Sequence, residues 1–188
     1  RSRWVRPDMN VSPTSLPGVL VIEPKIFGDS RGLFVETYNA ARYRAAGVEP
    51  TFVQDNLSRS MRGVLRGLHY QVEKPQAKLI TCLRGRIWDV AVDIRPGSPT
   101  YGKWFGLELD GISRKQLLVP IGFAHGFCVL EDDSEVFYKC SDEYFPAGEG
   151  SVAWNCPEIG IEWPITDPVL SAKDAAAPHL SKARQFPG

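Results

Sequence analysis

The hydrophobic residues of this chain fall into short runs, separated by 17 glycines and 15 prolines that are spread along its length. Short runs between closely spaced turn residues are typical of an all-β chain. Strands are predicted at Val19–Glu23, Gly32–Thr37, Val64–Tyr70, Lys78–Arg84, Arg86–Ile94, Lys103–Leu109, Gln116–Val119, His125–Leu130, Glu135–Cys140 and Ser151–Trp154. Helices are expected to be few and short, at Ala40–Ala46 and Ser171–Ala177.

The clearest element is a hairpin that runs from Lys78 to Asp93, with Gly85 in its turn. Side chains alternate between the two faces of a strand. In the second strand one face is therefore made of Trp88, Val90, Val92 and Ile94, and the other of Ile87, Asp89, Ala91 and Asp93. A face that holds two carboxylates must meet either solvent or the wet interior of a binding barrel.

Many short strands narrow the architecture to a jelly roll or a related β-sandwich. A lipocalin-like barrel and a sandwich without a cavity remain alternatives on pattern alone. The 188 residues, 43% of them hydrophobic, are enough for one domain, 1–188, with a core of its own. Residues 1–8 are interpreted as a cloning remnant or a disordered N-terminus, with Met9 as the natural start.

Composition excludes several classes of partner. The chain has 22 basic and 22 acidic side chains without a basic cluster, so no nucleic acid is expected. No apolar stretch approaches the roughly 18 residues that span a bilayer, and the N-terminus lacks the apolar run of a signal peptide. The four cysteines are scattered and form no CxxC pair, which favours neither zinc nor disulfides and suits the cytoplasm.

The motifs of several enzyme classes are absent. We find no GxGxxG, no Walker loop and no GxSxG. The segments around His69 and Pro120–His125 resemble those of metal-binding cupins, whose fold is a double-stranded β-helix. However, Lys78 stands where such cupins have a glutamate ligand. Because a lysine repels a divalent ion and only two of four ligands remain, we expect neither a metal nor a cofactor.

Proton transfer beside a ketone suits the residues that replace the metal ligands. This chemistry needs a base, a stabiliser for the enolate oxygen and a proton donor. His69 is a suitable base, since an unperturbed imidazole has a pKa of about 6.5. Lys78 and Arg66 are suited to stabilise the negative charge on the enolate oxygen. Tyr138 could return a proton to the opposite face of a sugar ring, and this would invert the carbon centre.

Several motifs occur in the same order as in one enzyme family, from about Gly18 to Leu180. They include Phe27-Gly-Asp-Ser-Arg31-Gly, Phe52-Val-Gln-Asp-Asn56, Val64-Leu-Arg66-Gly-Leu-His69, Gly122-Phe-Ala-His125-Gly-Phe, Glu149-Gly-Ser and Leu170-Ser-Ala-Lys-Asp174-Ala-Ala-Ala-Pro. Together they closely resemble the dTDP-4-dehydrorhamnose 3,5-epimerases, which implies a cupin-type jelly-roll barrel.

The resemblance also implies roles for individual residues. His69 corresponds to the family's catalytic base, with Asp174 orienting it, and Tyr138 to its acid. The nucleotide-sugar contacts correspond to Arg31, Glu36, Gln54, Asn56, His125, Glu149 and Lys173. Tyr144 is expected to stack on the thymine. Family members are homodimers whose N-terminal strands cross to the partner, so Phe27 and Arg31 are expected to serve the neighbouring site.

Taken singly, these residues have ordinary structural explanations as well. His69 could be a half-buried histidine, Tyr138 a core ring and Lys78 a solvated lysine. Asp174 fits the first turn of a helix, and pattern alone does not select it over Asp89 or Asp93 as the partner of the histidine.

The expected activity is inversion of C3 and C5 of dTDP-4-dehydro-6-deoxy-D-glucose, which gives dTDP-4-dehydro-L-rhamnose. The alternatives are an epimerase of C3 only on another dTDP-4-keto-6-deoxyhexose, a metal-dependent cupin enzyme, and a cupin that binds sugar nucleotides without catalysis.

Overall fold

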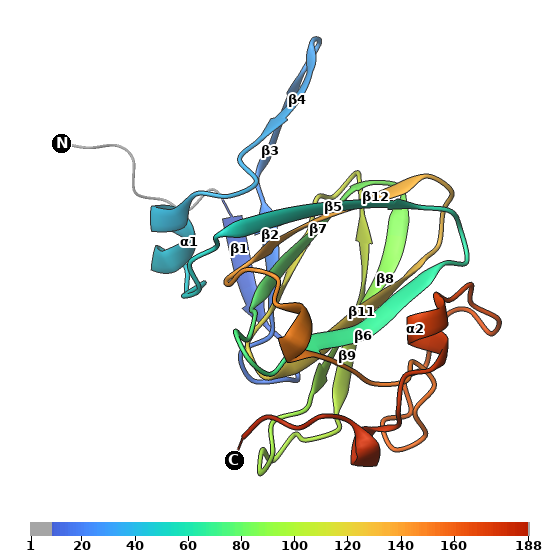
Figure 1. Cartoon of the computed structure of the whole chain (residues 1–188). Helices are drawn as coiled ribbons and strands as arrows, with labels where there is room; N and C mark the ends of the chain where they lie inside the picture. The colour runs from blue at the N-terminus through green and yellow to red at the C-terminus, as the bar shows by residue number, and fades with distance from the viewer. Residues whose placement is uncertain (1–8, 188) are drawn as a thin grey trace.

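The computed structural model describes residues 9–187 and shows a barrel of two facing β-sheets (Figure 1). The residues 1–8 discussed above lie outside the described part. One sheet has the order β1 (Met9–Pro13), β2 (Leu20–Pro24), β10 (Gln116–Val119), β7 (Lys78–Arg84), β12 (Ser134–Cys140), β5 (Gln54–Ser60). The other has the order β13 (Glu149–Ser151), β6 (Leu65–Gln71), β11 (Phe123–Val129), β8 (Arg86–Asp93), β9 (Trp104–Asp110).

Neighbouring strands pair antiparallel in both described sheets, and the predicted all-β class is confirmed. The helices are α1 (Ala40–Ala45) and α2 (Ala172–Ala175), capped by the side chains of Asn39 and Ser171. Within the described residues, neither these nor the 3-10 turns at Pro146–Gly148 and Leu180–Lys182 could cross a bilayer as a helix.

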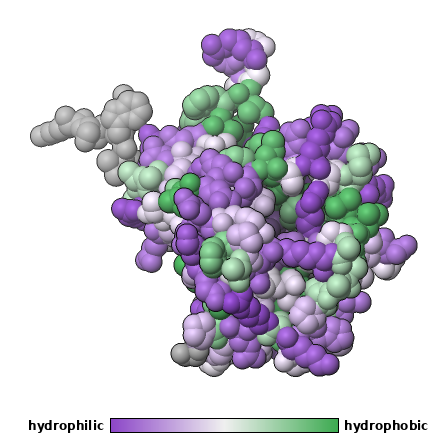
Figure 2. Space-filling view, viewed as in Figure 1, coloured by the Kyte–Doolittle hydropathy of each residue, from purple (hydrophilic) through white to green (hydrophobic). Residues whose placement is uncertain are grey.

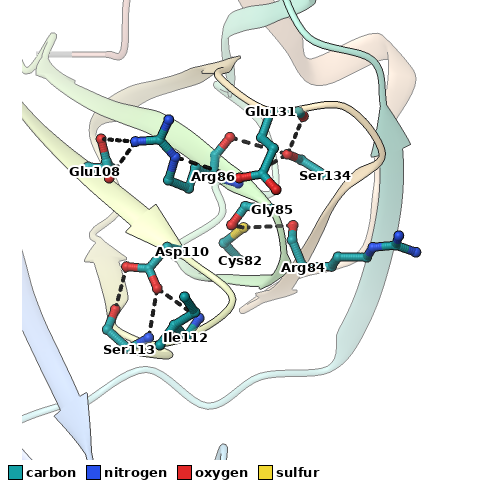
Figure 3. A network of polar contacts seen from close by, with 10 residues as sticks. All are labelled: Cys82, Arg84, Gly85, Arg86, Glu108, Asp110, Ile112, Ser113, Glu131 and Ser134. Atoms are coloured by element: carbon teal, nitrogen blue, oxygen red, sulfur yellow. Dashed lines mark hydrogen bonds and ion pairs between the residues drawn. The ribbon is translucent and has the colours of Figure 1, made fainter.

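The predicted hairpin is formed by β7 and β8, and Gly85 occupies its turn with φ +74°. A Cβ atom at this position would lie 2.2 Å from the Oγ atom of Ser134, so the turn requires glycine. Figure 3 shows how the turn is held: Ser134 Oγ accepts from the Arg86 N–H and donates to the carbonyl of Glu131 at 2.6 Å. The Arg86 guanidinium also lies 3.4 Å from a carboxylate oxygen of Glu108.

Sequence and structure differ at four strands. No strand was predicted at β1, β3 (Ile26–Asp29) or β5, and the strand predicted at 151–154 is found at Glu149–Ser151. The shift at β13 follows from its pairing, because Glu149 to Ser151 lie opposite Gln71 to His69 of β6.

The main core lies between the two sheets. Its buried side chains come from both, and they include Ile80, Ile87, Leu117, Phe127 and Val136. A second cluster packs α1 against the outside of the larger sheet, and a third packs the C-terminal segment against the outside of the smaller one. The two carboxylates of β8, Asp89 and Asp93, are fully buried, so that face of β8 is turned to the interior and not to solvent.

A two-stranded arm of β3 and β4 (Gly32–Val35) projects from the barrel (Figure 1). Apolar surface gathers where this arm leaves the body (Figure 2). Its exposed apolar side chains are Ile26, Phe27, Leu33 and Phe34, the last with 68% of its surface exposed. An arm with so much apolar surface in water is typical of a segment that packs against another molecule.

Candidate active site

A cavity of about 430 Å³ lies inside the barrel, and its wall includes strands of both sheets and α2. All five residues predicted to be catalytic line it, together with His125 and Lys173. They are Arg66, His69, Lys78, Tyr138 and Asp174. The barrel thus brings together residues that are far apart in the sequence, such as Arg66 and Asp174.

His69 and Asp174 form a hydrogen-bonded pair at this cavity. The Nε2 atom of His69 lies 2.5 Å from Oδ1 of Asp174, and the Gly67 N–H donates to the other carboxylate oxygen at 3.4 Å. Burial acts to raise the pKa of Asp174, but the hydrogen bonds from His69, Gly67 and Ser171 outweigh it and lower this pKa below its usual value. Since an ionised carboxylate only accepts, Nε2 carries the hydrogen and Nδ1 keeps a lone pair for use as a base.

The strand that carries His69 approaches its neighbour unusually closely. Gly67 has φ +128°, and a Cβ there would lie 2.6 Å from Cα of Gly126 on β11. This approach sets His69 directly opposite His125 in the β6–β11 pairing.

His125 belongs to a second histidine–carboxylate pair. Its Nε2 atom lies 2.9 and 3.0 Å from the two carboxylate oxygens of Asp89. Burial raises the pKa of Asp89, while His125 and the charge of Lys78 act in the opposite direction. The sequence left Asp89 open as a partner for His69, but in the structure Asp89 is hydrogen-bonded to His125.

Lys78 and Tyr138 lie on the sheet opposite His69. The ammonium of Lys78 is 5.9 Å from the centre of the Tyr138 ring. Burial lowers the pKa of Lys78, although Cys140, Asp89 and Glu149 act to raise it. A lysine desolvated among acidic groups is suited to stabilise a negative oxygen in the cavity.

Tyr138 and Arg66 complete the polar wall. Burial raises the pKa of Tyr138, and the positive charge of Arg66 partly offsets this effect. The phenol therefore keeps its proton at neutral pH, as a proton donor must. Arg66 Nε donates to Ser60 Oγ at 3.1 Å, which fixes the guanidinium beside the cavity.

A second cavity of about 240 Å³ adjoins the first and shares His69, Lys78 and Tyr138 with it. Four residues predicted to contact the nucleotide sugar line it: Gln54, Asn56, Tyr144 and Glu149. They are linked to each other, since Gln54 bonds the amide side chain of Asn56 and the backbone N–H of Tyr144, and the Tyr144 hydroxyl donates to Glu149. Glu149 also forms an ion pair with Lys173.

Three residues of the predicted site line neither of these cavities. Phe27 and Arg31 belong to the projecting arm, where Arg31 pairs with Asp29 at 2.5 Å and its side chain is 87% exposed. Glu36 forms an ion pair with Arg42 of α1 at 3.1 Å.

A polar cavity between two sheets, with His69 on one wall and Tyr138 on the other, is found in this chain together with a close sequence match. The model of the dTDP-4-dehydrorhamnose 3,5-epimerase family matches residues 13–182. A dTDP-4-dehydrorhamnose 3,5-epimerase of Salmonella typhimurium is 52% identical over 178 residues, which cover 93% of this chain and 97% of the relative. The chain belongs to the dTDP-4-dehydrorhamnose 3,5-epimerase family.

Solved structures of dTDP-4-dehydrorhamnose 3,5-epimerases have the same architecture. One is a dTDP-6-deoxy-D-glucose-3,5-epimerase of Legionella pneumophila in complex with dTDP-4-keto-L-rhamnose. It is 46% identical, has a TM-score of 0.90, and the match covers 96% of this chain and 100% of that one. The predicted cupin-type jelly roll is thereby confirmed. A dTDP-4-dehydrorhamnose 3-epimerase of Streptomyces niveus is 43% identical over 94% of this chain and 86% of the relative.

In this member of the epimerase family, residues 9–187 contain no group of three or more His, Cys, Asp or Glu side chains that could hold a metal ion.

The sequence analysis does not select Ser58 and Phe127, which also line the larger cavity. The alternation of β11 could have indicated Phe127, whereas Ser58 lies in a polar segment that shows no strand pattern.

Proposed function

We propose that this chain inverts C3 and C5 of dTDP-4-dehydro-6-deoxy-D-glucose and releases dTDP-4-dehydro-L-rhamnose. The observation that supports this most strongly is the position of the two proton-transfer groups. His69 on β6 and Tyr138 on β12 belong to opposite sheets and line one cavity. A sugar ring between them would meet a base on one face and an acid on the other, which is the arrangement that inversion needs.

In the proposed mechanism, Nδ1 of His69 removes the proton from a carbon next to the C4 ketone. The electron pair of the C–H bond moves to the C4 oxygen, and the enolate is stabilised by Lys78 and Arg66. Tyr138 then donates its hydroxyl proton to the opposite face of the same carbon. The histidine later loses its proton to solvent, the phenolate regains one, and the sequence repeats at the second carbon.

The adjoining cavity is the proposed site of the nucleotide. Tyr144 is 54% exposed, so part of its surface is available to stack on the thymine. The ion pair of Glu149 with Lys173 and the amides of Gln54 and Asn56 provide polar contacts at the same place. His125 lies deeper and is proposed to contact the substrate rather than to transfer a proton.

We also propose a homodimer in which each arm crosses to the partner. Phe27 and Arg31 would then contribute to the neighbouring site, which agrees with their absence from the linings of the two cavities of their own chain. The exposed apolar side chains of the arm support this proposal. The four buried free thiols agree with a cytoplasmic location.

The first test is incubation with dTDP-4-dehydro-6-deoxy-D-glucose in D₂O. Deuterium at both C3 and C5 with inversion is the expected result. Deuterium at C3 alone would establish the alternative activity, which the 3-epimerase relative of Streptomyces niveus makes the second candidate. Binding of dTDP without any exchange would contradict catalysis altogether.

A further inference from the structure

The inner face of β5 carries a row of four polar side chains, because residues two apart share a face. They are Gln54, Asn56, Ser58 and Ser60. Asn56 lies opposite Tyr138 in the pairing with β12, and Ser58 lies opposite Val136, the next inward residue of β12. The row therefore runs along the cavity wall beside the proposed acid.

Three members of this row have hydrogen-bond partners in the protein. Gln54 bonds Asn56, the amide of Asn56 contacts the Cys140 sulfur, and Ser60 accepts from Arg66. The Oγ atom of Ser58 is buried and has no hydrogen-bond partner among residues 9–187. A buried hydroxyl without a partner destabilises a fold, so such a group in a cavity needs an explanation.

The surroundings of Ser58 indicate what could satisfy it. Besides Ser58, Arg66 and the polar residues of the site described above, the larger cavity is lined by apolar side chains, among them Val64, Phe127, Val169 and Leu170. A 6-deoxyhexose has the same mixed character, since it has ring hydroxyls and one methyl group. Unlike Arg66 or Lys78, a serine hydroxyl is neutral and can either donate or accept.

From this geometry we infer that Ser58 is a substrate-positioning residue whose hydroxyl bonds a ring hydroxyl of the hexose. The inference rests on the proposed epimerase function. The Ser58 hydroxyl has no hydrogen-bond partner among residues 9–187, and a ring hydroxyl of the bound hexose would supply one. Such a residue lowers stability and raises affinity for the sugar.

The test compares Ser58→Ala with a matched serine variant outside the cavity. Ser113 suits this purpose, because its hydroxyl donates to Asp110 at 2.7 Å in the turn after β9. We expect Ser58→Ala to lower kcat/KM for the dTDP-keto sugar about tenfold, the usual effect of one lost hydrogen bond. Its Kd for dTDP should stay unchanged, and its Tm should be equal or higher. Ser113→Ala should do the reverse, with a lower Tm and unchanged kcat/KM.

Ser58→Thr is the rescue variant, since it retains a hydroxyl, and its kcat/KM should exceed that of Ser58→Ala. A kcat/KM of Ser58→Ala within twofold of wild type would overturn the inference. A lower Tm together with weaker dTDP binding would overturn it too, because the hydroxyl would then be structural. Wild-type exchange in D₂O is measured first: its absence would refute the epimerase function itself, whereas normal exchange with an unaffected Ser58→Ala refutes only the role of Ser58.

Discussion

Three buried aspartates acquire different chemistry from their immediate neighbours. Asp174 holds His69, Asp89 holds His125, and Asp93 is bound by Arg95 and two hydroxyl groups. The pKa of Asp89 is raised by burial, whereas the hydrogen bonds around Asp93 and Asp174 lower theirs. Sequence pattern could not distinguish these aspartates as partners of the base, because partner choice depends on contacts between residues far apart in the chain.

Asp174→Asn is expected to reduce kcat by about 10²–10⁴-fold, the usual contribution of a general-base system. The asparagine can present its NH₂ group to Nε2, which favours the wrong tautomer of His69 and removes the lone pair from Nδ1. Steady-state kinetics measures the effect, and circular dichroism with dTDP binding shows that the fold persists. A variant with normal kcat would contradict the role of Asp174.

Asp93→Asn is expected to lower the free energy of unfolding by about 2 kcal/mol at pH 7, because the buried carboxylate accepts charged hydrogen bonds from Arg95, which is itself partly exposed. Burial acts to raise the pKa of Asp93, but bonds from Arg95, Ser98 and Thr100 outweigh it and hold the pKa well below its usual range. Because the pKa of Asp93 is lower in the folded protein than in the unfolded chain, the unfolded chain binds more protons in acid. The stabilisation is thus complete above the ordinary pKa of about 4 and declines as the pH falls toward the folded-state value.

Urea unfolding between pH 7 and pH 3 checks this prediction. The difference in the free energy of unfolding between wild type and Asp93→Asn should shrink steadily as the pH falls below about 4, because the ionised Asp93 no longer stabilises the wild type there. Asp167→Asn, at an exposed aspartate, is the control and should leave the curve unchanged. A difference that grew in acid would contradict the assignment.

At the scale of elements, the hairpin of β7 and β8 was predictable and β5 was not. The hairpin has a glycine turn and a face that packs in the core, so its alternation is visible in the sequence. The inner face of β5 lines the two polar cavities and its outer face is exposed. Its sequence, Gln-Asp-Asn-Leu-Ser-Arg-Ser, therefore shows no alternation of hydrophobic and polar residues. The motif from Phe52 to Asn56 indicated a substrate-binding role for this segment, although the hydrophobic pattern did not predict a strand there.

Gly85→Ala tests the hairpin turn, with Gly97→Ala as its matched control. Both glycines have positive φ, +74° and +78°, but an added Cβ meets Ser134 only at Gly85 and finds nothing within 4 Å at Gly97. Gly97→Ala should therefore cost only the backbone strain of about 1 kcal/mol. Gly85→Ala should cost about 1–3 kcal/mol more, because the turn must also move. If denaturant unfolding gives the two variants the same loss in free energy of unfolding, the structure accommodates the contact of the new Cβ with Ser134 without cost, which would contradict this prediction.

At the scale of the whole molecule, the barrel carries the proposed catalytic groups, and the arm carries Phe27 and Arg31, which line neither of the two cavities of their own chain. The family resemblance predicted this division, since Phe27 and Arg31 were expected to serve a neighbour. Strand patterns could not, because nothing in a single chain records the position of a second copy.

Mixing two impaired variants tests the proposed exchange of arms. Arg31→Ala should weaken turnover through the arm, and His69→Ala should abolish it through the barrel. A mixed dimer would contain one site with an intact barrel and an intact arm from the partner. Co-refolded mixtures should therefore regain activity that neither variant has alone, up to about half of one site per dimer by random pairing. Activity equal to the sum of the separate variants would contradict shared sites.

The pair of His69 and Asp174 joins residues 105 positions apart, and the aspartate lies on a short helix close to the C-terminal end of the sequence. During synthesis the base is thus made long before the carboxylate that orients it. A nascent or C-terminally clipped chain that ends before Asp174 could contain every strand of both sheets and still lack a competent base. If His69 acts as proposed, proton exchange on a keto sugar is available only to chains synthesised at least as far as Asp174.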